Sequence, residues 1–277
     1  MSEIKKKVDY VLFATNIITI NTINKRCLTN DRYVMFKSIT KLFIIIALAN
    51  LYNLGYLKFS DKIIKYFPNY MYPNIKLYHI INHTSGLLSK WSYLNKKTGR
   101  YVMYTNTEQY FDSKDRYKYV LSLPQTEKFK KFKYNNFTYD ILCAIIKKIT
   151  GQYVDDYLKK IFFDKYNIKI RWEKNFNQPY GAFGLHILYN DLHKLTNLIP
   201  FLKSINFNPN LVYHHINVSG YNFFGHTGSG GQYLYISLKY NMFFMALSFD
   251  DPDNKPTDKQ LSPKETKKIM RSMIRQI

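Results

Sequence analysis

The sequence predicts an α/β protein in which an antiparallel β-sheet is flanked by terminal helices and interrupted by an inserted helical lobe. Three observations predict this order: β-branched and aromatic runs near the N-terminus, apolar helical runs in the middle, and a glycine-rich turn between apolar runs near the C-terminus. We expect a single domain over residues 1–277, with a sheet lobe from about 1–37 and 220–277 and a helical lobe from about 38–219.

The N-terminal elements follow from short-range patterns. Residues 10–14 and 18–20 are strand-like runs that predict a hairpin, and the polar stretch 25–37 predicts a connector. The stretch from Ser38 to Gly55 is apolar on nearly every side, which is typical of a buried helix. Ser60-Asp61 predicts the N-cap of a short helix that ends by Pro68.

The middle and C-terminal elements are mostly helical and then strand-like. A short helix is expected over 75–82, and few periodic signals stand out over 88–130. Thr138–Ile149 predicts an amphipathic helix closed by Gly151. Further expected elements are helices at 153–163 and 189–203, a hairpin formed by YLYISL and MFFMALSF, and a basic helix over Pro263–Ile277.

Composition narrows the class of protein. The net charge of +22 favours anionic partners, but the lysines are dispersed and the only compact run is Lys5–Lys7. No zinc-finger spacing or glycine-rich RNA-binding motif is present, so we expect codon bias of an AT-rich genome and no specific nucleic-acid binding. The cysteines, Cys27 and Cys143, do not make a disulfide framework.

Nothing in the sequence predicts export or membrane insertion. The N-terminus has no apolar signal core, and the longest apolar run, Leu42–Ala49, is too short to span a bilayer. We expect a cytoplasmic chain without a transmembrane segment.

The first chemical motif is Ser38-x-x-Lys41. Its spacing places both side chains on one face of a helix, where burial would desolvate the ammonium, lower its pKa and let the amine take the serine proton. A second copy, Ser2-x-x-Lys5, lies in the charged terminus, whereas Ser38 opens the most apolar helix of the chain. A plain core helix with a chance lysine is the alternative for this motif.

The second motif is Tyr134-Asn135-Asn136. A tyrosine can pass a proton between a lysine and a leaving group, and an amide can orient the lysine and the substrate. The same Tyr-x-Asn pattern occurs at Tyr72, Tyr93 and Tyr104, but only Tyr134 is followed at once by a well-formed apolar helix.

The third motif is His226-Thr227-Gly228-Ser229. A turn of small residues that enters an edge strand lets a substrate lie against backbone N–H groups. Lys97-Thr98-Gly99 is a similar stretch, but it precedes Tyr134 and no comparable hairpin follows it.

The three motifs in this order resemble the β-lactamase-related serine hydrolases, which include class C β-lactamases, D-alanyl-D-alanine carboxypeptidases and esterases of the penicillin-binding-protein-like fold. The resemblance also covers FKSITKLFIIIALANLYNLGYLKFSDKIIKYFP, IKLYHIINHTSGL and FGHTGSGGQ, and it runs from about residue 31 to residue 250. Two departures are Lys128-Phe129, where Pro-Gly is usual, and Phe183 before Gly184-Leu185, where Gly is usual. The short stretch before Ser38 is a third, and these departures leave room for a divergent or weakly active member.

The resemblance implies acyl transfer without a cofactor, on a small-molecule acyl substrate that the positive charge allows to be anionic. Ser38 would be the nucleophile, with Lys41 and Tyr134 moving its proton. The N–H groups of Ser38 and Ser229 would form the oxyanion hole. Asn136 would orient the substrate, while His226, Thr227 and Gly228 would line its pocket.

Family members that process β-lactams commonly carry lysine where this chain has His226, so we expect a preference for esters. A catalytically silent member acting as a binding module is the alternative function, and a basic nucleic-acid or membrane-surface protein is a more distant one. His79 and His83 have the spacing of two metal ligands on a helix, but no Glu follows as in a zinc protease, and we expect no metal site. His214-His215 is expected to be a solvated loop pair. The sequence does not determine the oligomeric state.

Overall fold

The structure is a computed structural model that describes residues 10–15, 19–23, 31–89, 92–95, 100–103, 105–247 and 262–276. The chain divides into two compact units. The sheet unit comprises the described parts of Met1–Phe43, Lys159–Arg171 and Leu185–Ile277, and the helical unit those of Ile44–Leu158 and Trp172–Gly184. The mixed α/β structure with antiparallel sheets confirms the predicted fold class. A single domain with lobe boundaries near residues 37 and 219 stays a prediction.

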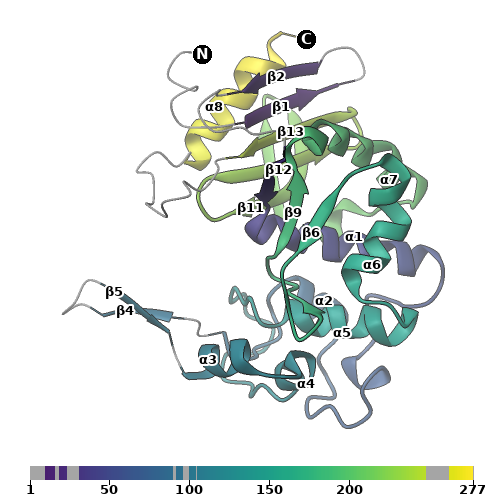
Figure 1. Ribbon diagram of the computed structural model, residues 1–277, viewed down its shortest axis with the longest axis vertical. Helices are drawn as coiled ribbons and strands as arrows, with labels where there is room; N and C mark the ends of the chain where they lie inside the picture. The colour runs from purple at the N-terminus through teal and green to yellow at the C-terminus, as the bar shows by residue number, and fades with distance from the viewer. Residues whose placement is uncertain are drawn as a thin grey trace. The chain divides into compact units, whose positions relative to one another are not determined.

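The main sheet of the sheet unit has six antiparallel strands (Figure 1). In spatial order they are β10 (His214–Val218), β11 (Tyr221–Gly228), β12 (Gln232–Ser237), β13 (Met242–Leu247), β1 (Tyr10–Ala14) and β2 (Thr19–Ile23). The β1–β2 and β12–β13 pairs confirm both predicted hairpins. β1 also pairs with β13, with Leu12 opposite Met245, so the two ends of the chain share one sheet as predicted.

Burial explains the sequence pattern of these strands. Every residue of β1, β12 and β13 is buried, which is why they are continuous apolar runs rather than alternating ones. The predicted terminal helix, α8 (Pro263–Ile274), covers one face of the sheet (Figure 1), where Met270 and Met273 share a core with Phe13 and Phe244.

Gly225 allows β11 and β12 to approach closely. A Cβ atom built at this position would overlap the carbonyl oxygen of Leu234 and would lie 2.8 Å from a ring carbon of Tyr235. Glycine is therefore required here by space rather than by its backbone angles.

A smaller sheet in the order β3 (Tyr33–Met35), β9 (Leu185–Leu188) and β6 (Ile170–Trp172) lies beside the start of α1 (Thr40–Asn53). The amide of Leu185 donates to Thr40 Oγ1 (3.3 Å), and the amide of Phe36 donates to the Leu185 carbonyl (2.8 Å). β3 lies within the stretch 25–37 that was predicted as a connector, and the strand was missed because three residues are too few to show a period.

Short helical segments complete the sheet unit. They are the π-helix Lys159–Phe163, the 3₁₀ helices η5 (Asp164–Tyr166), η6 (Tyr189–Asn197) and η7 (Pro209–Leu211), and α7 (Leu198–Ser204). The predicted helix over 189–203 is therefore confirmed, with a 3₁₀ first half. The π-helix lies in the predicted stretch 153–163, directly after α6 (Val154–Leu158).

The helical unit is built around α5 (Tyr139–Thr150), which is buried from Tyr139 to Ile146. Gly151 ends α5 with φ +73°, which confirms the predicted amphipathic helix and its glycine cap. The unit also contains most of α1, α6, η3 (Ile63–Lys65), α2 (Leu77–Ile81), α3 (Thr105–Asp112), α4 (Arg116–Leu121) and the two-stranded pairs β4 (Ser92–Asn95) with β5 (Arg100–Met103) and β7 (Lys174–Asn175) with β8 (Gln178–Pro179).

Two local predictions are wrong. Asp61 does not cap a helix: its carboxylate accepts from the Lys58 amide, Lys65 Nζ and the Tyr66 hydroxyl, and the 3₁₀ turn that follows has Lys62 before it. His214 and His215 are not a loop pair, because they begin β10, where His214 is opposite Gly225. β10 lies at the edge of the sheet, where its residues alternate between half-buried and exposed positions, so its apolar–polar alternation is weak in the sequence.

A fully buried ion pair anchors the first turn of α5. Arg116 Nε donates to Asp140 Oδ2 at 2.5 Å, and neither side chain is exposed. The Asp140 carboxylate also accepts from the Tyr110 hydroxyl (2.8 Å) and the Gly181 amide (2.6 Å). Burial opposes the charge of Arg116, but Asp140 and Tyr110 raise the pKa of its guanidinium above the ordinary value.

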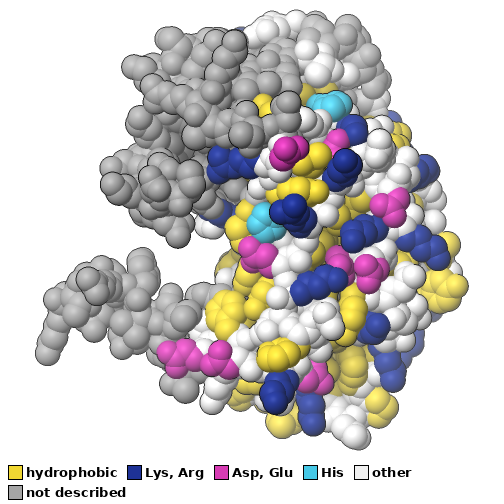
Figure 2. All heavy atoms as spheres, in the orientation of Figure 1, with side chains coloured by type: hydrophobic (Ala, Val, Ile, Leu, Met, Phe, Trp, Pro, Cys, Tyr) yellow, Lys and Arg dark blue, Asp and Glu magenta, His cyan; other side chains and the backbone are white. Residues whose placement is uncertain are grey.

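Charged side chains of both signs are interspersed on one face of the molecule. On the face shown in Figure 2, Lys and Arg alternate with acidic and apolar side chains instead of forming one basic patch. Within the described residues, the helices are too short or too polar to span a membrane.

Candidate active site

Ser38 and Lys41 lie together in the sheet unit, as their spacing predicted. Ser38 is in the 3₁₀ turn η2 (Lys37–Ile39), and Lys41 is in the first turn of α1. Lys41 Nζ donates a hydrogen bond to Ser38 Oγ over 3.1 Å. The Lys41 side chain is completely buried and Ser38 is half-buried, so the amine is held against the hydroxyl where a charged ammonium is costly.

The backbone is strained immediately before the serine. Lys37 has φ +45°, in the left-handed region that residues other than glycine rarely adopt. Such a conformation costs about 1–3 kcal/mol and occurs often at functional sites. This conformation could not be predicted, because a lysine carries no sequence signal for a positive φ.

The third motif lies beside this serine turn, in the same unit. His226, Thr227 and Gly228 end β11, and Ser229 begins the turn into β12. A Cβ at Gly228 would lie 3.3 Å from Lys37 Cβ, so glycine permits the close approach of the two segments. The two segments are also joined through Gln232, whose Nε2 donates to the Met35 carbonyl (2.9 Å).

His226 is buried and is held by the protein at both ring nitrogens. Nδ1 lies 2.7 Å from the Thr227 carbonyl oxygen, which can only accept, so Nδ1 carries a proton. Nε2 lies 3.2 Å from the hydroxyl of Tyr213. In a neutral imidazole Nε2 then accepts from that hydroxyl. Tyr213 is a partner that sequence analysis missed, since it lies outside the three motifs.

The second motif belongs to the helical unit. The Tyr134 ring is exposed and Asn136 is half-buried, while the middle residue, Asn135, is buried. Asn135 Nδ2 donates to the carbonyls of Leu87 (3.1 Å) and Leu88 (2.8 Å), and its Oδ1 accepts from the Phe137 amide (2.9 Å). Asn135 therefore anchors the segment that presents the two predicted side chains, a role the sequence did not reveal.

His83 supports the same segment. Its Nδ1 accepts from the Asn135 amide (3.1 Å), its carbonyl accepts from the Lys133 amide (2.8 Å), and its ring centre lies 4.6 Å from that of Tyr134. His83 has φ +55°, which turns the chain sharply after α2. Within the described residues, His79 likewise accepts at Nδ1, from the Lys76 amide, and no group of three His, Cys, Asp or Glu side chains could hold a metal ion.

Two of the three departures from the usual family pattern have local explanations. The Phe129 ring packs on the edge of the His79 ring at 4.7 Å, and Lys130 takes the positive φ (+65°) in this turn. Phe183 stacks on Tyr180 with ring centres 4.8 Å apart. The neighbouring Gly184 carries the positive φ, so Phe183 needs no glycine-like backbone.

Ser38, Lys41 and His226–Ser229 are thus brought together within the sheet unit, and Tyr134 and Asn136 are placed within the helical unit. The joint action of the two groups stays a prediction.

The family follows from comparison with known proteins. Residues 24–179, more than half of the chain, match the family model described as Beta-lactamase. The chain therefore belongs to the Beta-lactamase family, the β-lactamase-related serine hydrolases that its motifs resemble. Penicillin-binding protein 4* of Bacillus subtilis (strain 168) is 24% identical over 196 residues, which cover 65% of this chain and 42% of that protein. The chain thus spans less than half the length of this relative.

Solved structures are similar over nearly the whole chain. The D-amino acid amidase from Ochrobactrum anthropi SV3, complexed with L-phenylalanine, has a TM-score of 0.69 at 14% identity, covering 99% of this chain and 97% of that one. FmtA from Staphylococcus aureus has a TM-score of 0.65 at 16% identity, with 99% and 85% covered. A penicillin-binding protein from Bacillus halodurans has a TM-score of 0.62 at 14% identity, with 98% of both chains covered. At these identities the likeness establishes the fold.

Proposed function

We propose that the protein is a serine hydrolase that forms an acyl-enzyme on Ser38 and acts on an ester or amide of a small acyl compound. The observation that carries the proposal is the 3.1 Å hydrogen bond between Ser38 Oγ and the completely buried Lys41 Nζ. A serine becomes a useful nucleophile when a base accepts its proton as the bond to carbon forms. An amidase and a penicillin-binding protein among the similar structures support substrates of this class.

In the proposed reaction, Ser38 Oγ forms a bond to the substrate carbonyl carbon while its proton passes to Lys41 Nζ. The tetrahedral intermediate then expels the leaving oxygen or nitrogen, which takes up that proton by way of Lys41 and Tyr134. Water attacks the acyl-enzyme, gives a proton to the same groups and releases the acid, and the hydroxyl of Ser38 is restored. Asn136 orients the substrate and Lys41.

The developing oxyanion needs hydrogen-bond donors that are fixed before the reaction. We propose the backbone N–H groups of Ser38 and Ser229. Two features support this assignment: the strained backbone at Lys37, and the close approach of Gly228 to that residue. Thr227 and Gly228 line the substrate site, and His226 assists proton transfer or charge stabilisation.

We further propose that esters are preferred to β-lactams. A lysine at position 226 would place a full positive charge near a substrate carboxylate, whereas the observed His226 has its hydrogen-bonding capacity directed at Thr227 and Tyr213. Without that charge, the binding free energy of a carboxylate-bearing substrate is weaker by about 1–2 kcal/mol.

Covalent labelling tests the proposal directly. A fluorophosphonate should add one adduct to the intact protein, mapped to the peptide that contains Ser38. Ser38→Ala should abolish the adduct, and Ser2→Ala, the matched control in the second Ser-x-x-Lys copy, should retain it. An adduct that persists in Ser38→Ala would refute the assignment, and no adduct on the wild-type protein would favour a catalytically silent binding module.

A further inference from the structure

The helical unit carries a basic loop over residues 128–133, directly before Tyr134, with the sequence KFKKFK. Its four lysines and the second of its two phenylalanines are exposed: Lys128, Lys130, Lys131, Lys133 and Phe132. The phenylalanines interrupt the lysines, so the loop is not a compact run of like charges in the sequence. The folded loop nevertheless exposes four ammonium groups to solvent within six residues.

The charge of the basic loop is not balanced locally. Among the described residues, no ion pair includes any of its four lysines. Glu127, the acidic residue that precedes the loop, accepts instead from the Ser89 hydroxyl (3.3 Å). Burial lowers the pKa of His79, and the charges of Lys130 and Lys76 lower it further, so Lys76 adds a fifth positive charge to the same region.

The two phenylalanines of the basic loop have different surroundings. The Phe129 ring packs on the edge of the His79 ring, with centres 4.7 Å apart. The Phe132 ring lies edge-on to the His83 ring at 5.9 Å, yet its side chain is 55% exposed. More than half of a large apolar side chain therefore remains in water between lysines, and a partner that covered it would gain free energy.

The basic loop is held in place by the turn that follows α2. The amide of Lys130 donates to the Thr84 carbonyl (2.9 Å), and the amide of Lys133 donates to the His83 carbonyl (2.8 Å). The loop thus presents Phe132 and its lysines from a fixed backbone. Little conformational freedom of the backbone is lost when such a loop binds a partner.

We propose that the basic loop docks on an anionic lipid bilayer, with the Phe132 ring in the headgroup region and the lysines against acidic headgroups. Peripheral proteins bind such membranes through buried apolar area together with attraction of lysine and arginine to anionic lipids. Single-stranded nucleic acid fits less well, because successive bases need several exposed rings on which to stack, and one of the two rings in this loop is packed on His79. The loop also has no arginine, the residue that binds phosphate groups in a bidentate manner.

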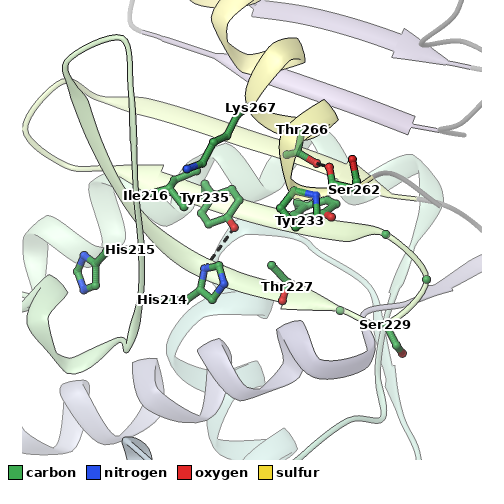
Figure 3. A pocket seen from close by; sticks show the side chains of 14 residues that line it. His214, His215, Ile216, Thr227, Ser229, Tyr233, Tyr235, Ser262, Thr266 and Lys267 are labelled. Atoms are coloured by element: carbon green, nitrogen blue, oxygen red, sulfur yellow. Dashed lines mark hydrogen bonds between the residues drawn. The ribbon is translucent and has the colours of Figure 1, made fainter. Parts of the chain in front are cut away.

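The docking surface is independent of the proposed hydrolase reaction, since it uses none of the residues assigned to that reaction. It also lies outside the pocket of about 730 Å³ in the sheet unit (Figure 3). Thr227, Gly228 and Ser229 line that pocket, which therefore belongs to the proposed substrate site. Fluorophosphonate labelling of the same samples keeps the two proposals separate, because a missing adduct would count against the hydrolase alone.

The first test is co-sedimentation of the full chain with vesicles of phosphatidylcholine alone and of equal parts phosphatidylcholine and phosphatidylserine. The wild type should bind the mixed vesicles saturably, bind the neutral ones weakly, and dissociate as salt rises. The double variant Lys128→Gln/Lys131→Gln should bind the mixed vesicles about 30-fold more weakly, since each lysine at an anionic surface contributes about five-fold. Lys58→Gln/Lys118→Gln removes the same charge from exposed positions of the same unit outside the loop and should bind nearly as the wild type does.

The second test concerns the exposed ring. Phe132→Ser should weaken binding to the mixed vesicles about ten-fold, whereas Phe176→Ser, the control at a ring that is 56% exposed in the same unit, should leave it unchanged. The tryptophan emission of Phe132→Trp should shift to shorter wavelength on these vesicles as the ring enters the headgroup region, and that of Phe176→Trp should not. Trp91 and Trp172 contribute to both spectra alike.

Three results would overturn the proposal. Equal losses in the two lysine double variants would show a general attraction of the positive chain. Undiminished binding by Phe132→Ser, with no emission shift in Phe132→Trp, would show that the ring does not enter the bilayer. Retention of the chain by single-stranded oligothymidylate through Lys128 and Lys131, without sedimentation on the mixed vesicles, would assign the loop to nucleic acid instead.

Discussion

Replacing Asp140 by asparagine should be among the most destabilising changes of similar volume in the helical unit. Asparagine keeps the size of the side chain and an oxygen for the Tyr110 hydroxyl or the Gly181 amide, so the main loss is the charge opposite Arg116. Removing one partner of a fully buried ion pair leaves an uncompensated charge and costs about 3–5 kcal/mol. Since domains are stable by about 5–15 kcal/mol, Asp140→Asn should lose a large part of the total.

The assay is urea unfolding followed by circular dichroism, with a double-mutant cycle that includes Arg116→Met. The double variant carries neither charge of this pair, so it should be less destabilised than the sum of the two single variants by about 2 kcal/mol or more. Lys65→Met is the matched control, because the Lys65 side chain of the Lys65–Asp61 ion pair is 53% exposed. Exposed ion pairs contribute only about 0–1 kcal/mol to the free energy of unfolding. A loss below about 1 kcal/mol for Asp140→Asn, or strict additivity in the cycle, would refute the reasoning.

Four further predictions concern catalysis, pH and charge. Lys41→Met and Tyr134→Phe should each reduce ester turnover on the order of 100-fold or more, and the double variant should be little worse than the poorer single; multiplying losses would contradict a shared proton-transfer unit. The free energy of unfolding should fall as pH drops from 7.5 to 5.5. Burial lowers the pKa values of His79 and His214 below the ordinary 6.5, so these histidines bind protons at a higher pH in the unfolded chain than in the folded one. Replacing both by glutamine should make the free energy of unfolding depend less on pH. A short-chain nitrophenyl ester should have a higher kcat/KM than a chromogenic cephalosporin, and His226→Lys should narrow the difference about ten-fold; a cephalosporin preferred by the wild type would overturn this order. Binding to random DNA should be weak at physiological salt and fall steeply as salt rises, whereas tight, sequence-selective binding there would contradict a dispersed charge.

The sequence predicted those parts of the fold whose signals are local. α5 shows a one-sided apolar period and ends at a glycine with the expected positive φ, and α1 is a continuous apolar run because all of its first turns are buried. The β12–β13 hairpin has apolar runs on both sides of KYN. The hydrogen bond between Ser38 and Lys41 could also be predicted from the sequence, since three residues make nearly one helical turn.

Features that depend on distant partners could not be predicted. Asn135 and His83 are 52 residues apart, and neither residue type signals a hydrogen bond across that separation. β3 is a strand only because β9, about 150 residues later, pairs with it. Lys37 takes a positive φ where its surroundings fix the serine turn, and the Asp61 carboxylate binds groups on both sides of it in place of capping a helix. In each case a tertiary contact overrides the local preference of the residue.

Because β11 and β12 pack tightly at Gly225, a substitution there would also affect residues that lie beyond the contact itself. Gly225→Ala adds a single methyl group, yet that methyl would collide with the Leu234 carbonyl, and the collision can be relieved only by moving β11 away from β12. His226 is the next residue, and Gly228 fits against Lys37 at the end of the same strand. A one-nucleotide change at a position without a reactive atom would therefore displace the strand that carries the proposed site residues.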